Sequence, residues 1–330
     1  MFGLAKSAPK ARADYASCSG CGLCLLVCPV WRRSHDLGLT PLGRAKALQH
    51  GAVAANIAVS IQSCTLCAAC EPACPEEIGL VAMTLDLRRQ LALPIPGLLS
   101  RMHEQSTRPL ALRETRAATL IPGPALREHH VTLARAAALL GGAGRIPISD
   151  DDGADIALAL EAGAVVPSQR LEGFLQSLRE LKQIVVADGL LLRHLRLWLP
   201  QPGIASIGEA LSGLAAIRRA LRASDLYVIE ARAYHADYER LVGYYDALRS
   251  SAGCAFNLDL QRIAIPASAR SLPQRLGLET GGDQVQARWI LQGRNITRIV
   301  VESVEDIAAF ERVTALPVVH LADLVDDGAS

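Results

Sequence analysis

Eight of the nine cysteines lie between residues 18 and 74, in two runs of identical spacing. The first run reads Cys18-Ser-Gly-Cys21-Gly-Leu-Cys24-Leu-Leu-Val-Cys28-Pro29, and the second reads Cys64-Thr-Leu-Cys67-Ala-Ala-Cys70-Glu-Pro-Ala-Cys74-Pro75. Cysteines with two residues between them are too close to pair comfortably as disulfides, and a cytoplasm would keep them reduced. Thiols at this density therefore indicate a metal site.

Both runs have the form C-x2-C-x2-C-x3-C-P, which is the run of bacterial-type ferredoxins, in which the fourth cysteine commonly ligates the other cluster. The pattern predicts two [4Fe–4S] clusters. One is assigned to Cys18, Cys21, Cys24 and Cys74, and the other to Cys64, Cys67, Cys70 and Cys28. Zinc is the alternative metal, but its sites normally use two separated cysteine pairs rather than an unbroken series of four before a proline.

The residues between the cysteines suit this chemistry. Gly20, Gly22, Ala68 and Ala69 are small, so backbone amides can approach the sulfurs and help to set the potential. After the third cysteine the chain can turn helical and carry the fourth toward the other cluster. Proline then ends that turn, because it has no N–H to donate and clashes with a preceding helical turn.

Helices are expected to carry the two arrays apart and back. Thr40 can cap a helix that Pro41 opens, and residues 81–91 have the spacing of an amphipathic helix that Pro94 and Pro96 end. The stretch between the arrays is too long for a small two-sheet ferredoxin. Residues 1–92 are therefore predicted to form an all-helical dicluster domain.

Residues 15–92 resemble the helical dicluster ferredoxin domain of several electron-transfer proteins, and the Pro41-Leu-Gly43-Arg44 segment is similar to an element that they place between their arrays. These relatives are the dicluster subunit of heterodisulfide reductase, the iron–sulfur subunit of glycolate oxidase, the small subunit of anaerobic glycerol-3-phosphate dehydrogenase and the lactate-utilisation iron–sulfur protein. The resemblance implies electron transfer beside a flavoprotein partner.

After an expected linker at 93–113, short apolar segments alternate with helical patterns, which predicts α/β units with a mainly parallel sheet. The helical spacing recurs near residues 171–178, 211–221 and 238–245. The expected strands are Ala118–Ile121, Ile146–Ile148, Ile184–Ala187, Leu226–Glu230, Phe256–Leu260 and Ile299–Val301. The overall prediction is an α+β multidomain chain in which two duplicated, Rossmann-like α/β lobes, 114–222 and 223–330, follow the helical domain.

These lobes resemble the paired cysteine-rich "CCG" domains of the same family, with the cysteines lost. Other residues stand at the corresponding places, and only Cys254 lies beyond residue 74. The lobes therefore cannot hold the further iron–sulfur centre of some relatives, because one thiolate cannot replace four or five. The places are Pro122-Gly123-Pro124, Asp151-Asp152-Gly153, Asp188 to Leu191, Tyr234-His235 and Ser303 to Asp306.

Composition excludes some functions. The net charge is +1 and aromatic residues are 4%, which gives no general attraction to nucleic acid and too few rings for base stacking. The most apolar segment, 190–199, is too short to span a bilayer, and no apolar segment of signal-peptide length follows the N-terminus. We expect a cytoplasmic protein without a membrane span, although a partner could hold it at the periphery of a membrane complex.

Weaker signals have structural interpretations. Cys254 is expected to be a small buried residue, His235 a helix-start hydrogen-bonding group, and His129-His130 a solvated pair. The Gly141-Gly142-Ala-Gly144 segment follows a helix and precedes a strand, so it is interpreted as a helix end rather than a nucleotide loop. Trp31-Arg32-Arg33, with Arg44 and Lys46, could form a basic face for an acidic partner or an ordinary solvated patch.

The leading hypothesis is an electron-transfer subunit of a hetero-oligomeric oxidoreductase. The partner would be a flavoprotein or another iron–sulfur subunit, and catalysis would take place in that chain, because no paired acid and base mark a substrate pocket here. One alternative is a self-contained reductase acting on a disulfide or quinone. The other is a scaffold whose clusters are structural.

Overall fold

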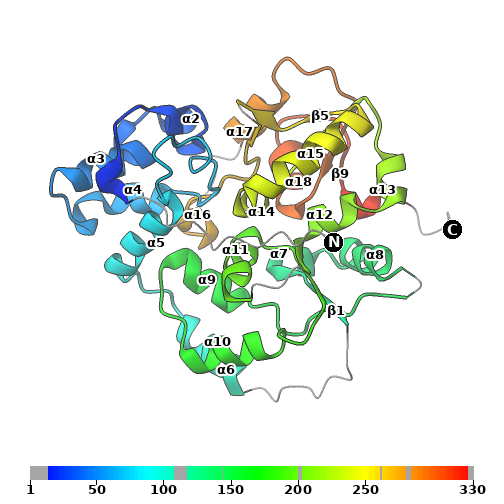
Figure 1. The fold of residues 1–330 in the computed structure, drawn as a ribbon, viewed down its shortest axis with the longest axis horizontal. Coiled ribbons are helices and arrows are strands. Elements are labelled where there is room, and N and C mark those ends of the chain that lie inside the picture. Colours follow the sequence, from blue (N-terminus) through cyan, green and yellow to red (C-terminus); the bar gives the residue numbers. More distant parts are fainter. Residues whose placement is uncertain are drawn as a thin grey trace, which may run out of the picture.

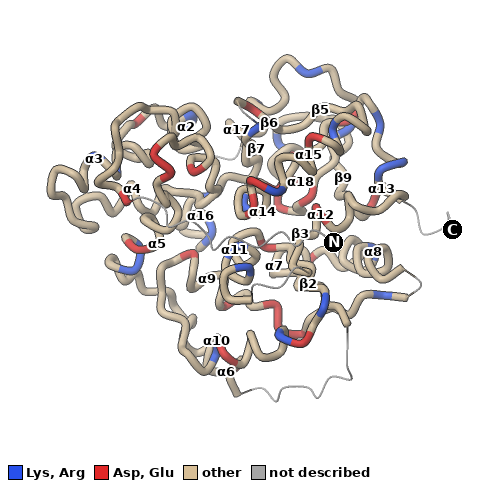
Figure 2. Tube along the Cα trace, in the orientation of Figure 1, with Lys and Arg blue, Asp and Glu red and all other residues tan. Residues whose placement is uncertain are grey.

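A computed structural model describes residues 14–107, 117–142, 144–199, 203–260, 262–279 and 284–325. The chain is mixed helix and strand, with a helical N-terminal part followed by two α/β regions (Figure 1). Acidic and basic positions are interleaved along the trace, as the balanced net charge requires (Figure 2). None of the helices in the described ranges combines the length and the apolar character needed to cross a membrane.

The N-terminal part consists of short helices around the two cysteine runs. Thr40 Oγ1 accepts a hydrogen bond from Gly43 N (3.1 Å) and Pro41 opens the helix, so the predicted cap is confirmed. The predicted helix at 81–91 is confirmed as Leu80–Leu91. The α-helices are α1 (Leu23–Leu26), α2 (Pro29–Ser34), α3 (Pro41–Gln49), α4 (Ala58–Ser63) and α5 (Leu80–Leu91), with 3-10 turns at Tyr15–Ser17, Leu37–Leu39 and Ala54–Ile57.

Gly43 lets α3 pack directly on the preceding turn. A Cβ at this position would lie 2.1 Å from the Leu37 carbonyl oxygen. The neighbouring Arg44 is 1% exposed and donates hydrogen bonds to Leu39 O and Ser60 O. The Pro41-Leu-Gly43-Arg44 segment therefore closes the helical part on itself.

We expect Gly43→Ala to destabilise the protein by about 1–3 kcal/mol, because the added methyl group overlaps backbone that cannot move freely. Gly243→Ala is the matched control. Gly243 lies in an exposed helix with nothing within 4 Å of an added Cβ, so alanine should be neutral or stabilise by about 0.5–1 kcal/mol. Chemical denaturation of the two variants measures the difference, and equal effects would contradict the packing argument.

The first α/β region is built on a parallel three-stranded sheet in the order β1-β2-β3. The strands are β1 (Ala118–Ile121), β2 (Gln183–Val186) and β3 (Ile204–Ser206). The helices of this region are α7 (Gly123–Glu128), α8 (His130–Gly141), α9 (Ala154–Ala162), α10 (Ser168–Gln176), α11 (Gly189–Trp198), α12 (Ile207–Ser212) and α13 (Ala215–Ala220). Helix α8 ends at Gly141, so the glycine-rich segment is a helix end as predicted.

The prediction that 93–113 is a linker is wrong in part. Residues Leu98–Thr107 form helix α6, which contacts α9 and α10. Leu98 and Met102 are buried on the first α/β region, so this apolar face supplies a reason for the helix to form. Residues 108–113 lie outside the described ranges.

The second α/β region contains a parallel four-stranded sheet in the order β5-β4-β8-β9 and a small antiparallel hairpin. The sheet strands are β4 (Asp225–Val228), β5 (Ala255–Phe256), β8 (Arg298–Val301) and β9 (Val318–His320), and β6 (Leu258–Asp259) pairs with β7 (Ile263–Ala264). The helices are α14 (Ala231–Ala236), α15 (Tyr238–Ala252), α16 (Leu272–Arg275), α17 (Gln284–Leu291) and α18 (Val304–Glu311).

Two of the predicted strands do not form as single strands. The segment 256–260 is two short strands rather than one, because Asn257 interrupts it: its side chain bonds Ile229 N (2.8 Å), Ile229 O (3.0 Å) and Ile265 O (2.8 Å). Ile146–Ile148 contributes only a single bridge, from Ile148 to Leu120. Strands β3, β7 and β9 were not predicted.

The two α/β regions meet through glycines at helix starts. A Cβ on Gly189 would lie 2.4 Å from Glu230 Oε2, and one on Gly208 would lie 2.2 Å from the carboxyl carbon of Glu302. Both glycines belong to the first region and both glutamates to the second. Their close approach places the carboxyl ends of the two sheets opposite each other.

Candidate metal centre

Four thiols of the helical part face one another across a cavity. Its lining includes Cys18, Cys21, Cys24 and Cys74, and its volume is about 340 Å³ with the part open to solvent included. Burial and then the neighbouring Cys74, Cys18 and Cys21 thiols raise the pKa of Cys24 to about 11. The fourth cysteine of the second run thus lies with the first three of the first run.

The remaining four thiols form a second group. Burial raises the pKa of the Cys67 thiol to about 12, with smaller contributions from Cys28 and Cys64. The pKa of Cys70 is raised by burial and by Cys67, Cys64 and Cys28. Cys28, from the first run, therefore lies with three cysteines of the second run. The thiols are thus interleaved, and the assignment of these cysteines as cluster ligands stays a prediction.

The donor set fits iron–sulfur clusters. Burial also raises the pKa of Cys28 to about 11, so these thiols need a nearby positive charge to become thiolates, as bound iron supplies. Cys64 differs: burial alone would raise its pKa, but Arg44 and Arg88 lower it below the ordinary value. Among the described residues, no three Cys, His, Asp or Glu side chains lie close enough around one point to bind a single metal ion. The thiolates of a tetrahedral zinc site would stand about 3.8 Å apart. Cluster thiolates bind different irons and need not converge in this way.

The two arrays share an unusual backbone conformation at equivalent positions. In the first, Gly20 and Gly22 have φ of 84° and 79°, and in the second Leu66 and Ala68 have φ of 51° and 61°. Left-handed residues alternating with right-handed or extended ones turn successive N–H groups to one side of a loop, which favours anions such as a sulfide cluster. The second array adopts this loop without glycine.

This equivalence predicts opposite effects for one pair of substitutions. Gly22→Ala should destabilise the protein by about 1 kcal/mol, because L-residues are strained at positive φ. Ala68→Gly should stabilise it by less, since the loss of a buried methyl group offsets part of the relieved strain. An added Cβ on Gly22 meets only Leu25 Cδ1, at an ordinary contact distance of 3.8 Å, so the loss of stability in Gly22→Ala would come from backbone strain and not from a steric clash. Denaturant unfolding of both variants tests the prediction, and effects of the same sign would contradict it.

Backbone amides of the second array approach two of its sulfurs, one of them at the small residue Ala69. The Ala69 N–H and the Thr65 hydroxyl both bond Cys67, and the Leu66 N–H bonds Cys64. Each bond stabilises the thiolate relative to the thiol. Such bonds are one of the means by which a protein sets cluster potentials.

The two arrays differ in exposure. Ser19, Gly20 and Cys21 in the first loop are exposed, whereas the equivalent Thr65, Leu66 and Cys67 are buried. Leu23 and Leu26, which follow the first loop, are 44% and 50% exposed. One array therefore opens onto the surface and the other lies inside the protein.

Residues of both α/β regions cover the second array. Arg232 donates to Thr65 O (2.6 Å), and His235 Nδ1 bonds Cys67 O (2.8 Å). Leu190 packs on Leu66 and Ala68, and Ile263 packs on Cys67 and Ala69. The prediction for His235 is confirmed in part: it bonds the Ala231 backbone at the start of its own helix α14, but it is also buried at 3% exposure and reaches the array.

The predicted basic face does not form. Arg44 is buried, Lys46 donates to Cys18 O (2.8 Å), and the Arg32 guanidinium lies 4.1 Å from the centre of the Trp289 ring. These cations instead hold the array and the second α/β region in place. Cys254 is buried with its pKa raised to about 11, and His129 and His130 are exposed, as expected.

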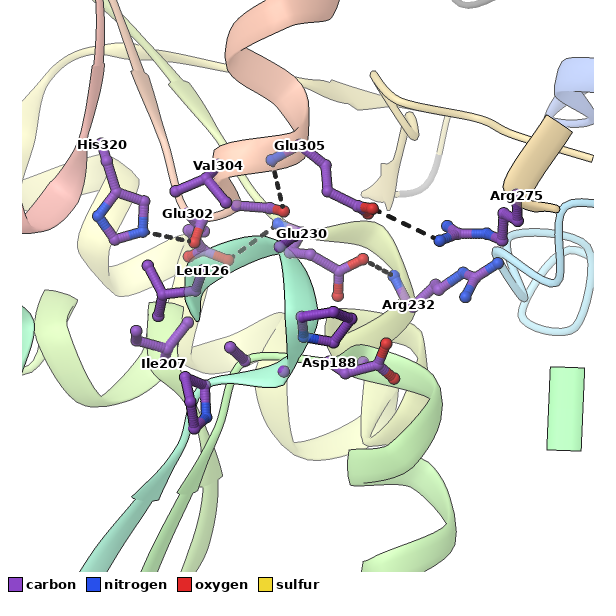
Figure 3. A pocket seen from close by; sticks show the side chains of 17 residues that line it. Leu126, Asp188, Ile207, Glu230, Arg232, Arg275, Glu302, Val304, Glu305 and His320 are labelled. Carbon is purple, nitrogen blue, oxygen red and sulfur yellow. Dashed lines mark hydrogen bonds and ion pairs between the residues drawn. The ribbon is translucent and has the colours of Figure 1, made fainter. Parts of the chain in front are cut away.

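Sequence reasoning missed a second cavity, which lies between the two sheets. Pro122, Gly123 and Pro124, together with Asp188 and Ser303, line it, so three of the segments that the sequence analysis compares with CCG cysteine positions come together (Figure 3). Asp151 does not join them, because it pairs with Arg170 at 2.8 Å. The signal in the sequence is that Asp188, Glu230 and Glu302 each follow closely on a strand, where parallel sheets place their sites.

Comparison with known proteins identifies the helical part. Residues 14–78 match the family model described as "4Fe-4S dicluster domain". No curated protein and no solved structure matches the chain. The match covers both thiol groups and the loops that surround them. The N-terminal part of this chain is therefore a 4Fe–4S electron-transfer domain of the ferredoxin-like type.

Proposed function

We propose that the chain is the iron–sulfur electron-transfer subunit of a multi-subunit oxidoreductase and holds two [4Fe–4S] clusters. In this proposal Cys18, Cys21, Cys24 and Cys74 hold one cluster, and Cys64, Cys67, Cys70 and Cys28 hold the other. When bound, each cluster supplies reversible one-electron transfer. The observation that carries the proposal is the interleaved grouping of the thiols, because two-cluster ferredoxins exchange their fourth cysteine ligand in this way.

The difference in exposure supports one docking face for a partner. The first array, with Cys21, Leu23 and Leu26 exposed, is the surface at which a flavoprotein or another iron–sulfur subunit would contact the chain. The second array is closed off by Arg232 and His235. The proposed complex is cytoplasmic or peripheral to a membrane, and its substrate binds the partner.

We further infer that the two α/β regions are duplicated lobes of the CCG type that have lost their cysteines. Each has a parallel sheet, and the segments at Pro122, Asp188 and Ser303 lie around one cavity, which supports this relationship. Their retained role is to bury the second array. Such burial affects the potential of a cluster, since solvent exposure is one of its determinants.

Purification of the native complex tests the proposal. The chain should carry about eight irons and eight sulfides, since it would hold two four-iron cubes, and a flavoprotein or iron–sulfur chain should copurify with it. Leu26→Glu should weaken this association while leaving the iron content unchanged, whereas Val165→Glu, at a 77% exposed position in the first α/β region, should have no effect. Equal association of the two variants would contradict the docking face, and two zincs in place of iron would contradict the function.

A further inference from the structure

The cavity between the two sheets is built as a ligand site, although the proposed function requires no ligand there. We propose that this cavity binds a small organic anion, with Arg275 as its counterion. The cavity opens to solvent, and its volume is about 590 Å³ with that open part included. The sequence, in which no paired acid and base mark a pocket, gives no indication of this cavity.

The cavity lies at the carboxyl ends of parallel strands from both regions. Pro122 follows β1, Ala187 follows β2 and Ile207 follows β3, while Glu302 follows β8 and His320 ends β9. Ligands of open parallel sheets bind at this edge. Helices α11 and α18 also begin here, so the positive ends of two helices of ten and eight residues face the cavity.

Arg275 has donors that the protein does not use. It forms ion pairs from Nε to Glu161 Oε1 at 3.5 Å and from Nη1 to Glu305 Oε1 at 3.6 Å, but no hydrogen bond among the described residues, and its Nε is buried. Arg170, by contrast, makes hydrogen bonds of 2.7–2.8 Å to Asp151 and Asp155. A guanidinium with five donors that is held by long contacts alone is available to a carboxylate.

The linked charges around Arg275 are unbalanced. Four guanidiniums share two carboxylates: Arg88, Arg232 and Arg275 pair with Glu161, and Arg275 and Arg270 pair with Glu305. Asp188 and Glu230 also line the cavity. Asp188 caps α11 through Leu191 N (2.7 Å), and burial raises the pKa of Glu230 to about 7, which reduces its negative charge. Since Asp188, Glu230, Glu302 and Glu305 all line the cavity, it carries no overall excess of positive charge, and an anion would be bound by the unused donors of Arg275.

The opposite end of the cavity is apolar. Figure 3 shows Leu126 and Ile207 on the side away from Arg232 and Arg275. The polar groups at the apolar end are satisfied internally: Glu302 accepts from the hydroxyls of Tyr227 (2.7 Å) and Tyr245 (2.6 Å), and His320 bonds Glu302 O and Ala322 N. A charged end and an apolar end favour an aliphatic carboxylate over an inorganic anion.

A neighbouring cavity of about 300 Å³ shares Glu230, Arg232 and Arg275 with this one and is also lined by Thr65 and Cys67. A ligand bound to Arg275 would therefore change the charge beside the buried array. This gives a second readout, because the spectrum of the cluster at Cys67 should respond and that of the cluster at Cys21 should not.

Calorimetric titration of the purified full chain with hexanoate, acetate and inorganic phosphate tests the proposal. Hexanoate should bind once per chain, and acetate and phosphate at least tenfold more weakly. Arg275→Gln should weaken hexanoate binding at least tenfold. Arg249→Gln is the control, since Arg249 pairs with Asp246 at 3.4 Å and does not line the cavity, and the affinity for hexanoate should stay within twofold.

Three results would overturn the proposal: no hexanoate binding to a folded chain, equal binding by Arg275→Gln, or tighter binding of phosphate than of hexanoate. Arg275→Lys controls for misfolding of the Arg275→Gln variant. It keeps the positive charge and should bind hexanoate with intermediate affinity. These outcomes are independent of iron content and of any partner. Failure here would therefore leave the electron-transfer proposal untouched.

Discussion

A Cys74→Ser chain is expected to lose the same cluster as a Cys21→Ser chain, although residues 74 and 21 belong to different runs. In the structure the Cys74 thiol lies with Cys18, Cys21 and Cys24. Loss of one thiolate should reduce the iron content from about eight toward about four per chain, since each cube holds four irons. Iron and sulfide analysis with electron paramagnetic resonance of the reduced protein measures the loss and identifies the cluster.

The reciprocal variant supplies the control. Cys28→Ser should remove the spectrum that Cys67→Ser removes, because Cys28 groups with the second run. Cys254→Ser, at a buried position in the second α/β region, should leave both spectra and the iron content unchanged. If Cys74→Ser and Cys70→Ser instead abolished one common signal, each run would hold its own cluster and the interleaved assignment would be wrong.

The second large effect is expected at Glu161. This carboxylate is 5% exposed and pairs with Arg232 at 2.7 Å, with Arg275 at 3.5 Å and with Arg88 at 3.6 Å. The three arginines come from α14, α16 and α5, so one side chain connects the helical part with both α/β regions. Glu161→Gln should destabilise the protein by about 3–5 kcal/mol, because it leaves buried guanidiniums without their counterion.

Glu172→Gln is the comparison that isolates burial. Glu172 pairs with Arg179 at 2.9 Å, but the two side chains are 58% and 53% exposed. The expected loss there is about 0–1 kcal/mol, since solvent screens the pair. Denaturant unfolding followed by circular dichroism gives both values, and similar losses would show that the buried network contributes no more than a surface pair.

The Glu161 network also predicts a pH dependence. Burial would raise the pKa of Glu161, but Arg232, Arg275 and Arg88 hold it at about 2, below the ordinary value of 4.5. A carboxyl whose pKa is depressed by folding contributes stability that is complete above its unfolded pKa and is lost as the pH falls toward the folded one. The difference between wild type and Glu161→Gln should therefore be constant above about pH 5 and shrink toward pH 2.

The chemistry of the helical part was readable from its sequence because ligand spacing is a local property. The cysteine runs, the Thr40 cap and the helix at 81–91 depend on residues close together in the chain. The alternation of strands and helices predicts β1 with its correct bounds and β2, β4 and β8 within two residues, but not β3, β7 or β9. Its failure at 256–260 has a local cause, because the Asn257 side chain takes over backbone bonds.

What the sequence could not reveal depends on contacts between distant residues. Nothing near His235 indicates that it reaches Cys67, 168 positions away, and nothing near Arg44 indicates that it is buried against Ser60 rather than exposed. Leu66 and Ala68 adopt a conformation that glycine favours, so composition alone argues against it. The cavity at Arg275 requires both sheets to be placed before it exists.

The enclosure of Thr65–Ala69 constrains how this protein matures. Arg232, His235, Leu190 and Ile263 cover that loop and leave beside it only the small cavity lined by Thr65 and Cys67, so iron and sulfide have a restricted approach to it once the chain has finished folding. Both cysteine runs leave the ribosome before any of these covering residues is made. We therefore expect cofactor insertion at Cys67 to occur co-translationally or on a partly folded intermediate, whereas the loop at Cys21 can still be loaded, or repaired after oxidative damage, in the finished protein.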